Sequence, residues 1–264
     1  MSQQAIDRSN AEFWDTLCGS NMARQAGITG RDEDDLRRFD DLYFEHYPYL
    51  ERYVPDSLAG KKVLEVGLGF GTLGQLLASR GADYHGADIA PGPVAMMRQR
   101  LEWLGLPTAG VREASVLELP WPESTFDYVY TIGCLHHTGD LLRSVDEVHR
   151  VLKPGGRAVV MLYNRHSFRR IAHATLDRLK GMSRRESEDA FRKMYDADEA
   201  GTAAPHTDFV SRGDVRCLFG KFERVKIDSQ NFDGFRYGIR REWFLNNLGR
   251  VVGLDLYIVA DKRS

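Results

Sequence analysis

One stretch of the sequence decides the fold: Val63-Leu64-Glu65-Val66-Gly67-Leu68-Gly69-Phe70-Gly71-Thr72-Leu73-Gly74. Its first four residues predict a short buried strand, and residues 73–79 have the apolar spacing of a helix. Between them, glycine stands at every second position from Gly67 to Gly71. Because glycine has no side chain, the backbone can turn tightly there and approach a ligand closely. The stretch therefore predicts a ligand-binding turn at the carboxyl end of a first strand.

One interpretation of this turn is a dinucleotide site. The glycines at positions 69, 71 and 74 satisfy the dinucleotide fingerprint, and Asp88 follows at about the distance needed to bind a ribose. In that frame, however, the buried central strand of an NAD domain has to contain Glu65. An NAD(P)-dependent oxidoreductase also needs a catalytic Tyr–Lys pair or a substrate domain, and neither is evident.

The other interpretation is the pattern Glu-x-Gly-x-Gly-x-Gly, which begins at Glu65. This pattern suits a ligand without a pyrophosphate, whose amino-acid portion lies against the turn. S-adenosylmethionine (SAM) is such a ligand. Glu65 would then favour its cationic end, and Asp88 would accept hydrogen bonds from both ribose hydroxyls. Asp88 also fits the simpler role of capping the following helix.

From Lys61 onward, short apolar runs alternate with segments of helical spacing. The predicted strands are 63–66, 84–89, 126–132, 158–162, 222–229 and 254–260. The predicted helices are 73–79, 94–104, 141–152 and 211–219. Gly81 and Gly105 stand where helix C-caps belong, and Lys153-Pro154-Gly155-Gly156 predicts a helix stop and a turn. This order predicts an α/β fold with a parallel sheet covered by helices on both faces.

The segments outside this alternation are charged in opposite senses. Residues 1–60 hold 12 acidic and 6 basic residues, and residues 165–193 hold nine Lys or Arg against four Asp or Glu. In the first segment we expect a short helix at 12–17, ending at Gly19, and an amphipathic helix at 34–50. One apolar face of the second helix carries Leu36, Phe39, Tyr43, Tyr47 and Leu50. Residues 164–208 predict one or two helices, and 240–253 a connection between the last two strands.

Composition sets the outer limits. The 264 residues are 42% hydrophobic and 28% charged, as in a globular protein, and the net charge of −2 does not favour nucleic acid or an anionic membrane as a partner. The three cysteines, Cys18, Cys134 and Cys217, lack the spacing of a metal site. The first 14 residues lack the apolar region of a signal peptide, and no stretch has the roughly 18 apolar residues of a membrane helix. We therefore expect a cytoplasmic protein with no metal.

Several further segments stand in a fixed order around the glycine turn. They are Gly86–Ile89, Leu119-Pro120-Trp121-Pro122, Phe126-Asp127-Tyr128-Val129, Leu135-His136-His137-Thr138 and Leu152-Lys153-Pro154-Gly155-Gly156-Arg157. Together with residues 63–71 they resemble class I SAM-dependent methyltransferases of the type-11 group, which includes the ubiquinone/menaquinone-biosynthesis methyltransferases. The resemblance covers roughly residues 61–162 well and the rest loosely.

This resemblance implies a Rossmann-like, doubly wound, mostly parallel sheet of seven strands. Residues 1–60 then form a helical N-terminal extension that serves as a lid. Residues 61–264 form the SAM-binding domain, in which the insertion 164–208 is an acceptor-binding cap.

The resemblance also implies roles for matching residues. Glycines of the turn line the methionine part of SAM, Asp88 binds its ribose, and Ser115 flanks the adenine where relatives often carry Asp. Gly133 lies beside the sulfonium, and the aromatic residues before the core either close over SAM or pack on the sheet. The predicted cofactor-binding set is Trp14, Glu65, Gly67, Gly69, Gly71, Asp88, Ile89, Ser115, Val116 and Gly133.

Methyl transfer from a sulfonium needs mainly proximity and alignment, and a base only where the acceptor must lose a proton. His136 and His137 follow the fourth predicted strand, so one of them is a candidate general base. The alternative is that the pair only supports its loop.

The acceptor is predicted more loosely. Tyr163, Asn164 and His166 follow the fifth strand, and His206 ends the insertion, so all four are candidate substrate-binding residues. The basic insertion would favour an anionic acceptor if it lined the site; otherwise it is a solvated helix face. We expect methyl transfer to oxygen or nitrogen of a small polar metabolite, and both sugar-like and anionic acceptors stay open. The alternatives are the NAD(P)-dependent oxidoreductase and a non-catalytic SAM-binding partner protein.

Overall fold

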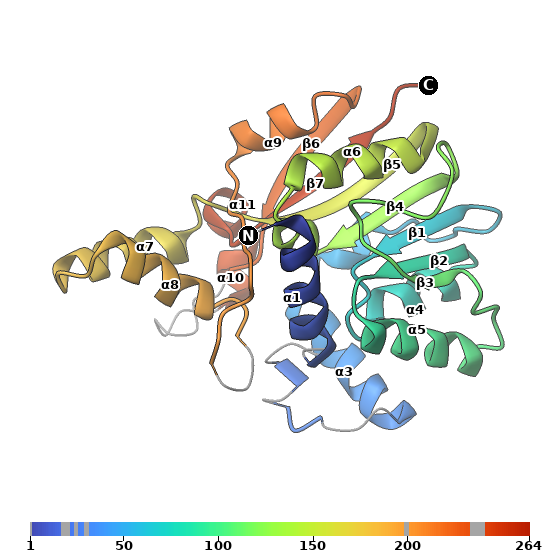
Figure 1. Cartoon of the computed structure of the whole chain (residues 1–264), viewed down its shortest axis with the longest axis horizontal. Coiled ribbons are helices and arrows are strands. Elements are labelled where there is room, and N and C mark those ends of the chain that lie inside the picture. The colour runs from blue at the N-terminus through green and yellow to red at the C-terminus, as the bar shows by residue number, and fades with distance from the viewer. Residues whose placement is uncertain (1, 17–21, 24–25, 29–31, 198–200, 233–240) are drawn as a thin grey trace.

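The structure, a computed structural model, describes residues 2–16, 22–23, 26–28, 32–197, 201–232 and 241–264. A seven-stranded sheet forms its centre, in the order β3-β2-β1-β4-β5-β7-β6 (Figure 1). The strands are β1 Lys62–Val66, β2 Asp83–Asp88, β3 Val111–Glu113, β4 Phe126–Ile132, β5 Leu152–Tyr163, β6 Arg224–Gln230 and β7 Asp255–Asp261. The predicted α/β class and seven-stranded sheet are confirmed.

Most of the sheet is parallel. The pairs β2–β3, β1–β2, β1–β4 and β4–β5 run parallel, and only β7 runs antiparallel to its neighbours β5 and β6. Both faces of the parallel part are covered, which explains why residues 63–66 of β1 are all buried and, apart from Glu65, apolar. The order places β1 at the point where the chain winds to either side of the sheet.

Different helices cover the two faces of the sheet. The helices are α1 Gln3–Thr16, α3 Glu33–His46, α4 Thr72–Ser79, α5 Pro91–Trp103, α6 Leu141–Val151, α7 Phe168–Leu179, α8 Arg184–Lys193, α9 Arg212–Leu218, α10 Arg241–Asn246 and α11 Gly249–Val252. Leu64 faces the core beneath α6 and α9, whereas its neighbour Val63 faces the core beneath α4 and α5. This alternation is the period-two pattern of a strand buried on both sides.

Three predicted boundaries were wrong. The first helix begins at Gln3 rather than near residue 12, and its predicted end at Gly19 lies outside the described residues. The second helix ends at His46, because the residue before Pro48 is disfavoured in the α conformation, and Leu50 begins a separate 3₁₀ turn. Strand β5 begins at Leu152, six residues before the predicted start at residue 158. The Lys153–Gly156 turn does stop α6, but it forms an irregularity within β5.

The insertion, for which one or two helices were predicted, forms two. Helices α7 and α8 project away from the sheet (Figure 1). Its two ends meet beside the core, because Asn164 and Val210 form a β-bridge and the backbone N–H of Val210 donates to the carbonyl of Tyr163 (2.9 Å). The insertion therefore leaves the core and rejoins it at neighbouring points.

A buried cation joins the N-terminal extension to the glycine turn. Arg100 on α5 is 1% exposed, and its guanidinium donates to both carboxylate oxygens of Asp40 on α3 (2.8 and 2.9 Å). Its Nε donates to the carbonyl of Phe70 in the turn (2.6 Å), and Asp40 also accepts from the hydroxyl of Thr72 (2.6 Å). A Cβ at Gly71 would lie 2.8 Å from Cδ of Arg100, so this glycine makes room for the cation.

We predict that Arg100→Met lowers the free energy of unfolding by about 3–5 kcal/mol, because it leaves the Asp40 carboxylate without its cation in a largely buried position. Urea denaturation followed by circular dichroism measures the loss. The matched control is Arg37→Met on α3, whose ion pair with Glu33 is exposed, and it should change stability by less than about 0.5 kcal/mol. Equal losses in the two variants would contradict the role given to Arg100.

Candidate functional site

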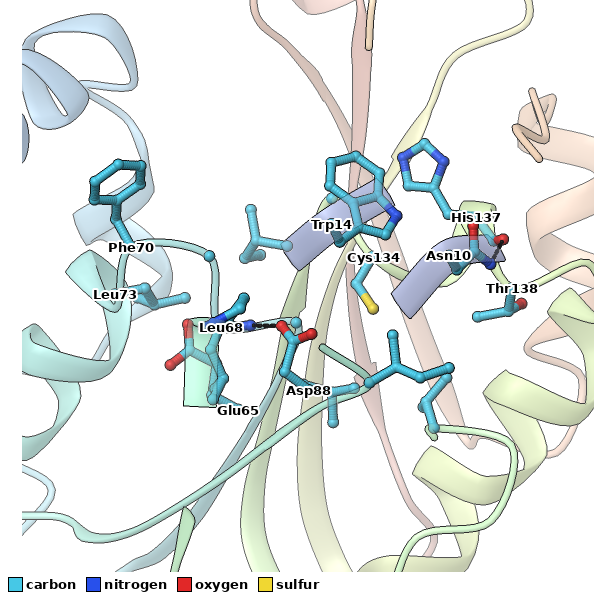
Figure 2. A pocket seen from close by; sticks show the side chains of 18 of the residues that line it. Asn10, Trp14, Glu65, Leu68, Phe70, Leu73, Asp88, Cys134, His137 and Thr138 are labelled. Carbon is cyan, nitrogen blue, oxygen red and sulfur yellow. Dashed lines mark hydrogen bonds between the residues drawn. The ribbon is translucent and has the colours of Figure 1, made fainter. Parts of the chain in front are cut away.

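A pocket of about 250 Å³ lies at the carboxyl ends of β1, β2 and β4 (Figure 2). This is the edge at which doubly wound sheets bind ligands. Nine of the ten residues predicted to bind the cofactor line it, namely Trp14, Glu65, Gly67, Gly69, Asp88, Ile89, Ser115, Val116 and Gly133. Gly71 is not among the lining residues, because it faces Arg100.

Glycine is found at Gly67 and at Gly69 for different structural reasons. Gly67 has a φ of +82°, and a Cβ there would lie 2.5 Å from Cβ of Cys134, so β1 and the loop after β4 could not approach as they do. Gly69 has a φ of +50°, and a Cβ there would meet nothing within 4 Å. Gly69 therefore borders open space, and the turn presents bare backbone to the pocket.

Glu65 lies beside this turn and is 3% exposed. Its carboxyl accepts a hydrogen bond from the Tyr84 hydroxyl (2.6 Å), and burial raises the pKa of Glu65 to about 8. A Cβ at Gly74 would lie 2.5 Å from the Tyr84 oxygen and 2.6 Å from the Glu65 carboxyl. Gly74, the third glycine of the dinucleotide interpretation, thus makes room for this pair.

Asp88 ends β2 and connects it to the turn. One carboxylate oxygen accepts from the backbone N–H of Leu68 (2.7 Å) and the other from that of Ala90 (3.0 Å), as Figure 2 shows for Leu68. Burial raises the pKa of Asp88 to about 6. The backbone N–H groups of Ile89 and Gly69 also bond this carboxylate and oppose that rise, so Asp88 is held by the turn at the edge of the pocket.

Ser115, Val116 and Gly133 border the pocket from the loops after β3 and β4. The Ser115 hydroxyl accepts from the backbone N–H of Leu117 (3.3 Å), and Val116 is buried. Gly133 has a φ of +79°, but a Cβ there would make only an ordinary contact with Met161 (3.5 Å). Its backbone conformation, rather than crowding, accounts for a glycine at this position.

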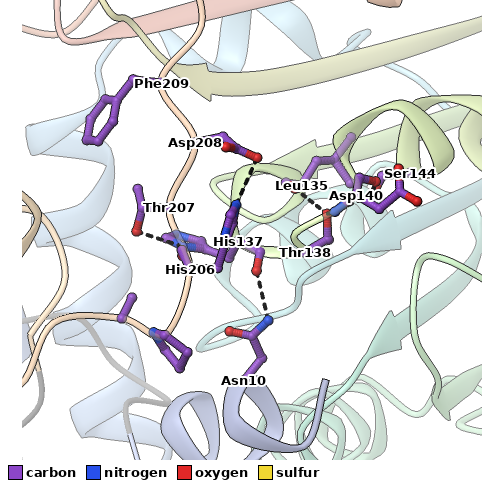
Figure 3. Close-up of polar contacts among 12 residues, drawn as sticks. Asn10, Leu135, His137, Thr138, Asp140, Ser144, His206, Thr207, Asp208 and Phe209 are labelled. Carbon is purple, nitrogen blue, oxygen red and sulfur yellow. Dashed lines mark hydrogen bonds and ion pairs between the residues drawn. The ribbon is translucent and has the colours of Figure 1, made fainter. Parts of the chain in front are cut away.

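Helix α1 is held over the pocket by polar contacts at both ends. Asn10 donates to the carbonyl of His137 (2.8 Å), as Figure 3 shows, and Gln3 donates to that of Thr138 (2.8 Å). Toward the other end, Asp15 accepts from the backbone N–H of Gly92 at the start of α5 (2.6 Å). These contacts bring the Trp14 ring to a centroid distance of 4.7 Å from that of His137.

The two histidines have different environments. His137 lines the pocket and is 4% exposed, with Nδ1 2.7 Å from the carbonyl of His206. Because a carbonyl can only accept, Nδ1 carries the hydrogen and Nε2 keeps a lone pair. Nε2 lies 3.6 Å from Oδ2 of Asp196, and burial lowers the pKa of His137. His136 does not line the pocket, and its buried ring packs on Tyr163 at 3.9 Å.

None of the four residues predicted to bind the acceptor lines the pocket. The side chain of Asn164 bonds the Gly253 carbonyl and the His166 backbone N–H, and His166 itself is exposed. Tyr163 and His206 each contact a residue that lines the pocket, namely Asp196 and His137. Tyr163 donates to the Asp196 carboxylate (3.0 Å), and His206 fixes the tautomer of His137 through its carbonyl.

Sequence reasoning missed several residues of the pocket wall. Tyr43 was assigned to the apolar face of a helix, and it does lie on that face, where it lines the pocket. Asn10 and Cys134 had no motif to identify them. Asp196 is the one described residue of the insertion that lines the pocket, and no sequence pattern marks it.

The pocket is acidic. Asp7, Glu65, Asp88 and Asp196 line it, and no described Lys or Arg does. The expected anionic acceptor depended on the basic insertion lining the site. Among the residues whose positions are described, its Lys and Arg side chains do not reach the lining.

Two other chemistries find no residues here. Within the described ranges, no group of three or more His, Cys, Asp or Glu could hold a metal ion. Cys134 lines the pocket, but burial raises the pKa of its thiol to about 12, so it is a poor nucleophile. No helix in the described part of the chain is long and apolar enough to cross a membrane.

Comparison with known proteins finds similar sequences and similar folds. Residues 64–160 match a family model described as a methyltransferase domain. A demethylmenaquinone methyltransferase of Thermus thermophilus is 38% identical over 105 residues, covering 39% of this chain and 47% of that protein. A ubiquinone biosynthesis O-methyltransferase of Pseudomonas aeruginosa is 34% identical over 113 residues, covering 42% of this chain and 47% of that protein. The chain thus spans about half the length of the curated relatives it matches.

The fold likeness extends further along the chain. A Thermotoga maritima structure, described as a SAM-dependent methyltransferase and possible histamine N-methyltransferase, covers 86% of this chain and 91% of its own, with a TM-score of 0.55. At 18% identity, this likeness shows the fold alone. By the matched domain and the relatives, residues 64–160 form a methyltransferase domain similar to the class I SAM-dependent methyltransferases of the type-11 group.

Proposed function

We propose that the pocket binds SAM and that the chain transfers a methyl group to oxygen or nitrogen of a small polar acceptor. The observation that carries the proposal is the open space at Gly69, which is bordered by the buried carboxyls of Glu65 and Asp88. Bare backbone and two acids suit a ligand with an amino-acid end, a positive charge and a ribose. When bound, SAM supplies a methyl group already activated on a sulfonium.

The residues of the chain then have distinct tasks. Glu65 faces the positive charge of the amino-acid end, Asp88 accepts from the ribose, and Ser115 and Val116 border the adenine. Helix α1, with Trp14, forms a lid, and the insertion forms a cap over the acceptor. Both exclude water and align the acceptor, which is most of what this reaction needs.

The dinucleotide alternative loses its support at Gly74. That glycine is required by the packing of α4 on Glu65 and Tyr84, and it is not among the residues that line the pocket. The fingerprint match at positions 69, 71 and 74 therefore needs no pyrophosphate to explain it.

His137 is the proposed general base. Its Nδ1–H donates to the His206 carbonyl, so the neutral ring directs the Nε2 lone pair away from that contact. Burial lowers the pKa of His137, which keeps the ring neutral and able to accept a proton at pH 7. His136 lies behind Tyr163 and supports the loop.

Asp88→Asn should raise the dissociation constant of SAM by about 10–100-fold, because the neutral amide makes weaker hydrogen bonds to the ribose than a carboxylate does. Isothermal titration calorimetry with SAM and, separately, NADH measures the effect. Asp83→Asn, at the exposed start of the same strand, is the matched control and should leave binding unchanged. Binding of NADH without SAM would reject the proposed function.

SAM binding at pH 7 should release a proton from Glu65. With a pKa of about 8, this carboxyl is mostly protonated at pH 7, and a nearby cation favours the carboxylate and lowers its pKa. The binding enthalpy should then vary with the ionisation enthalpy of the buffer at pH 7. The variation should fade above pH 8, where the carboxyl is already ionised. Glu65→Gln should abolish it, and a buffer-independent wild-type enthalpy would remove Glu65 from the cationic end.

A further inference from the structure

Part of the pocket wall lies outside the set of residues proposed to bind SAM. Asn10 from α1, Tyr43 from α3, His137 from the loop after β4, and Asp196 from the insertion form this part, which we call the acceptor wall. Contacts link three of them, since Asn10 donates to the His137 carbonyl and Asp196 Oδ2 lies 3.6 Å from Nε2 of His137, while Tyr43 lines the same pocket from α3. The acceptor wall is where a second ligand can meet the first.

Two polar atoms of the acceptor wall are free to accept hydrogen bonds from a ligand. Asn10 uses its amide nitrogen on the His137 carbonyl, which leaves its Oδ1 buried without a partner (Figure 3). His137 uses Nδ1 on the His206 carbonyl, which leaves Nε2 buried without a hydrogen-bond donor. Both side chains are 4% exposed. Two unsatisfied acceptors at such depth indicate a ligand that brings donors.

Asp196 adds a negative charge to these acceptors. Its side chain is 18% exposed, and its Oδ2 accepts from the Tyr163 hydroxyl (3.0 Å) and lies 3.6 Å from Nε2 of His137. Among the described residues, no Lys or Arg is paired with this carboxylate. Arg192 of the insertion directs one guanidinium nitrogen to the carbonyls of Ala204 and Pro205.

Aromatic rings complete the surroundings. The Trp14 ring packs on His137, and Tyr43 lines the pocket on the α3 side. Aromatic faces attract organic cations, and the attraction grows when the cation leaves water. A carboxylate, two neutral acceptors and aromatic rings together match a protonated amine, which brings up to three N–H donors and a positive charge. A carboxylate or phosphate would bring only acceptors and a repelled charge.

We propose that the acceptor is an amine, which binds as its ammonium ion against Asp196 and is methylated on nitrogen. This inference rests on the proposed function and narrows it. His137 Nε2 takes one proton from the ammonium, and the resulting imidazolium lies beside the Asp196 carboxylate. The freed nitrogen lone pair forms the new N–C bond, while the C–S bond breaks and its electron pair stays on sulfur. The product is an N-methylammonium ion and a neutral thioether.

Binding to the protein loaded with S-adenosylhomocysteine tests this without turnover. The probes are phenethylamine, 2-phenylethanol and phenylacetate, which share a ring and chain and differ in their polar group. We expect the amine to bind about 10–100-fold more tightly than the alcohol or the carboxylate, as a charge-assisted hydrogen bond predicts. Asp196→Asn should abolish that preference. Glu188→Gln on α8 removes a carboxylate of the same insertion away from the pocket and should keep the preference.

The outcomes separate the two proposals. Failure to bind S-adenosylhomocysteine at all would overturn the proposed function. Normal binding of that ligand, with the alcohol or carboxylate bound as well as the amine, would overturn only the amine inference. Absence of amine binding at millimolar concentration would overturn it equally, as would an amine preference that survives Asp196→Asn.

Discussion

A guanidinium cannot stay in a protein interior without partners, and the way Arg100 meets that requirement sets the position of much of the pocket. Its bonds to Asp40 and to the Phe70 carbonyl fix α3 against the glycine turn. The turn in turn supplies the Leu68 N–H that Asp88 accepts. Helix α3 carries Tyr43 into the pocket wall. The N-terminal extension is therefore part of the ligand site rather than an attachment to it.

The sheet could be predicted from sequence because its strands are local patterns. Val63–Val66 and Phe126–Ile132 are apolar runs between turn signals, and both form strands within a residue of the expected bounds. Helix α1 had no such signal, since residues 3–12 are mostly polar. Contacts made by Gln3 and Asn10 with a loop more than a hundred residues away hold its first turns. The three-residue β3 is likewise too short to show a period.

The same division runs through the pocket. Eight of the nine predicted cofactor residues that line the pocket lie on the glycine turn or at strand ends, where the family resemblance placed them, and the ninth, Trp14, lies on α1. The proposed acceptor wall is assembled by tertiary structure. Asp196 stands in no motif, and the carbonyl that fixes the tautomer of His137 belongs to His206, 69 positions later. A sequence pattern describes side chains and cannot show where a backbone oxygen lies. The sequence therefore suggested the His206 ring as a ligand contact, whereas in the structure its backbone carbonyl makes the contact with His137.

The bridge between Asn164 and Val210 has a consequence for how such a protein diversifies. Because the chain departs from and returns to adjacent points of the core, changing the length of the excursion costs little closure entropy and leaves the strand register alone. The segment can therefore be replaced by one of another length without altering the sheet. Asp196 travels with that segment, whereas Glu65 and Asp88 stay behind. Under the proposed function, sequence changes in this segment alter the acceptor wall and leave the cofactor residues unchanged.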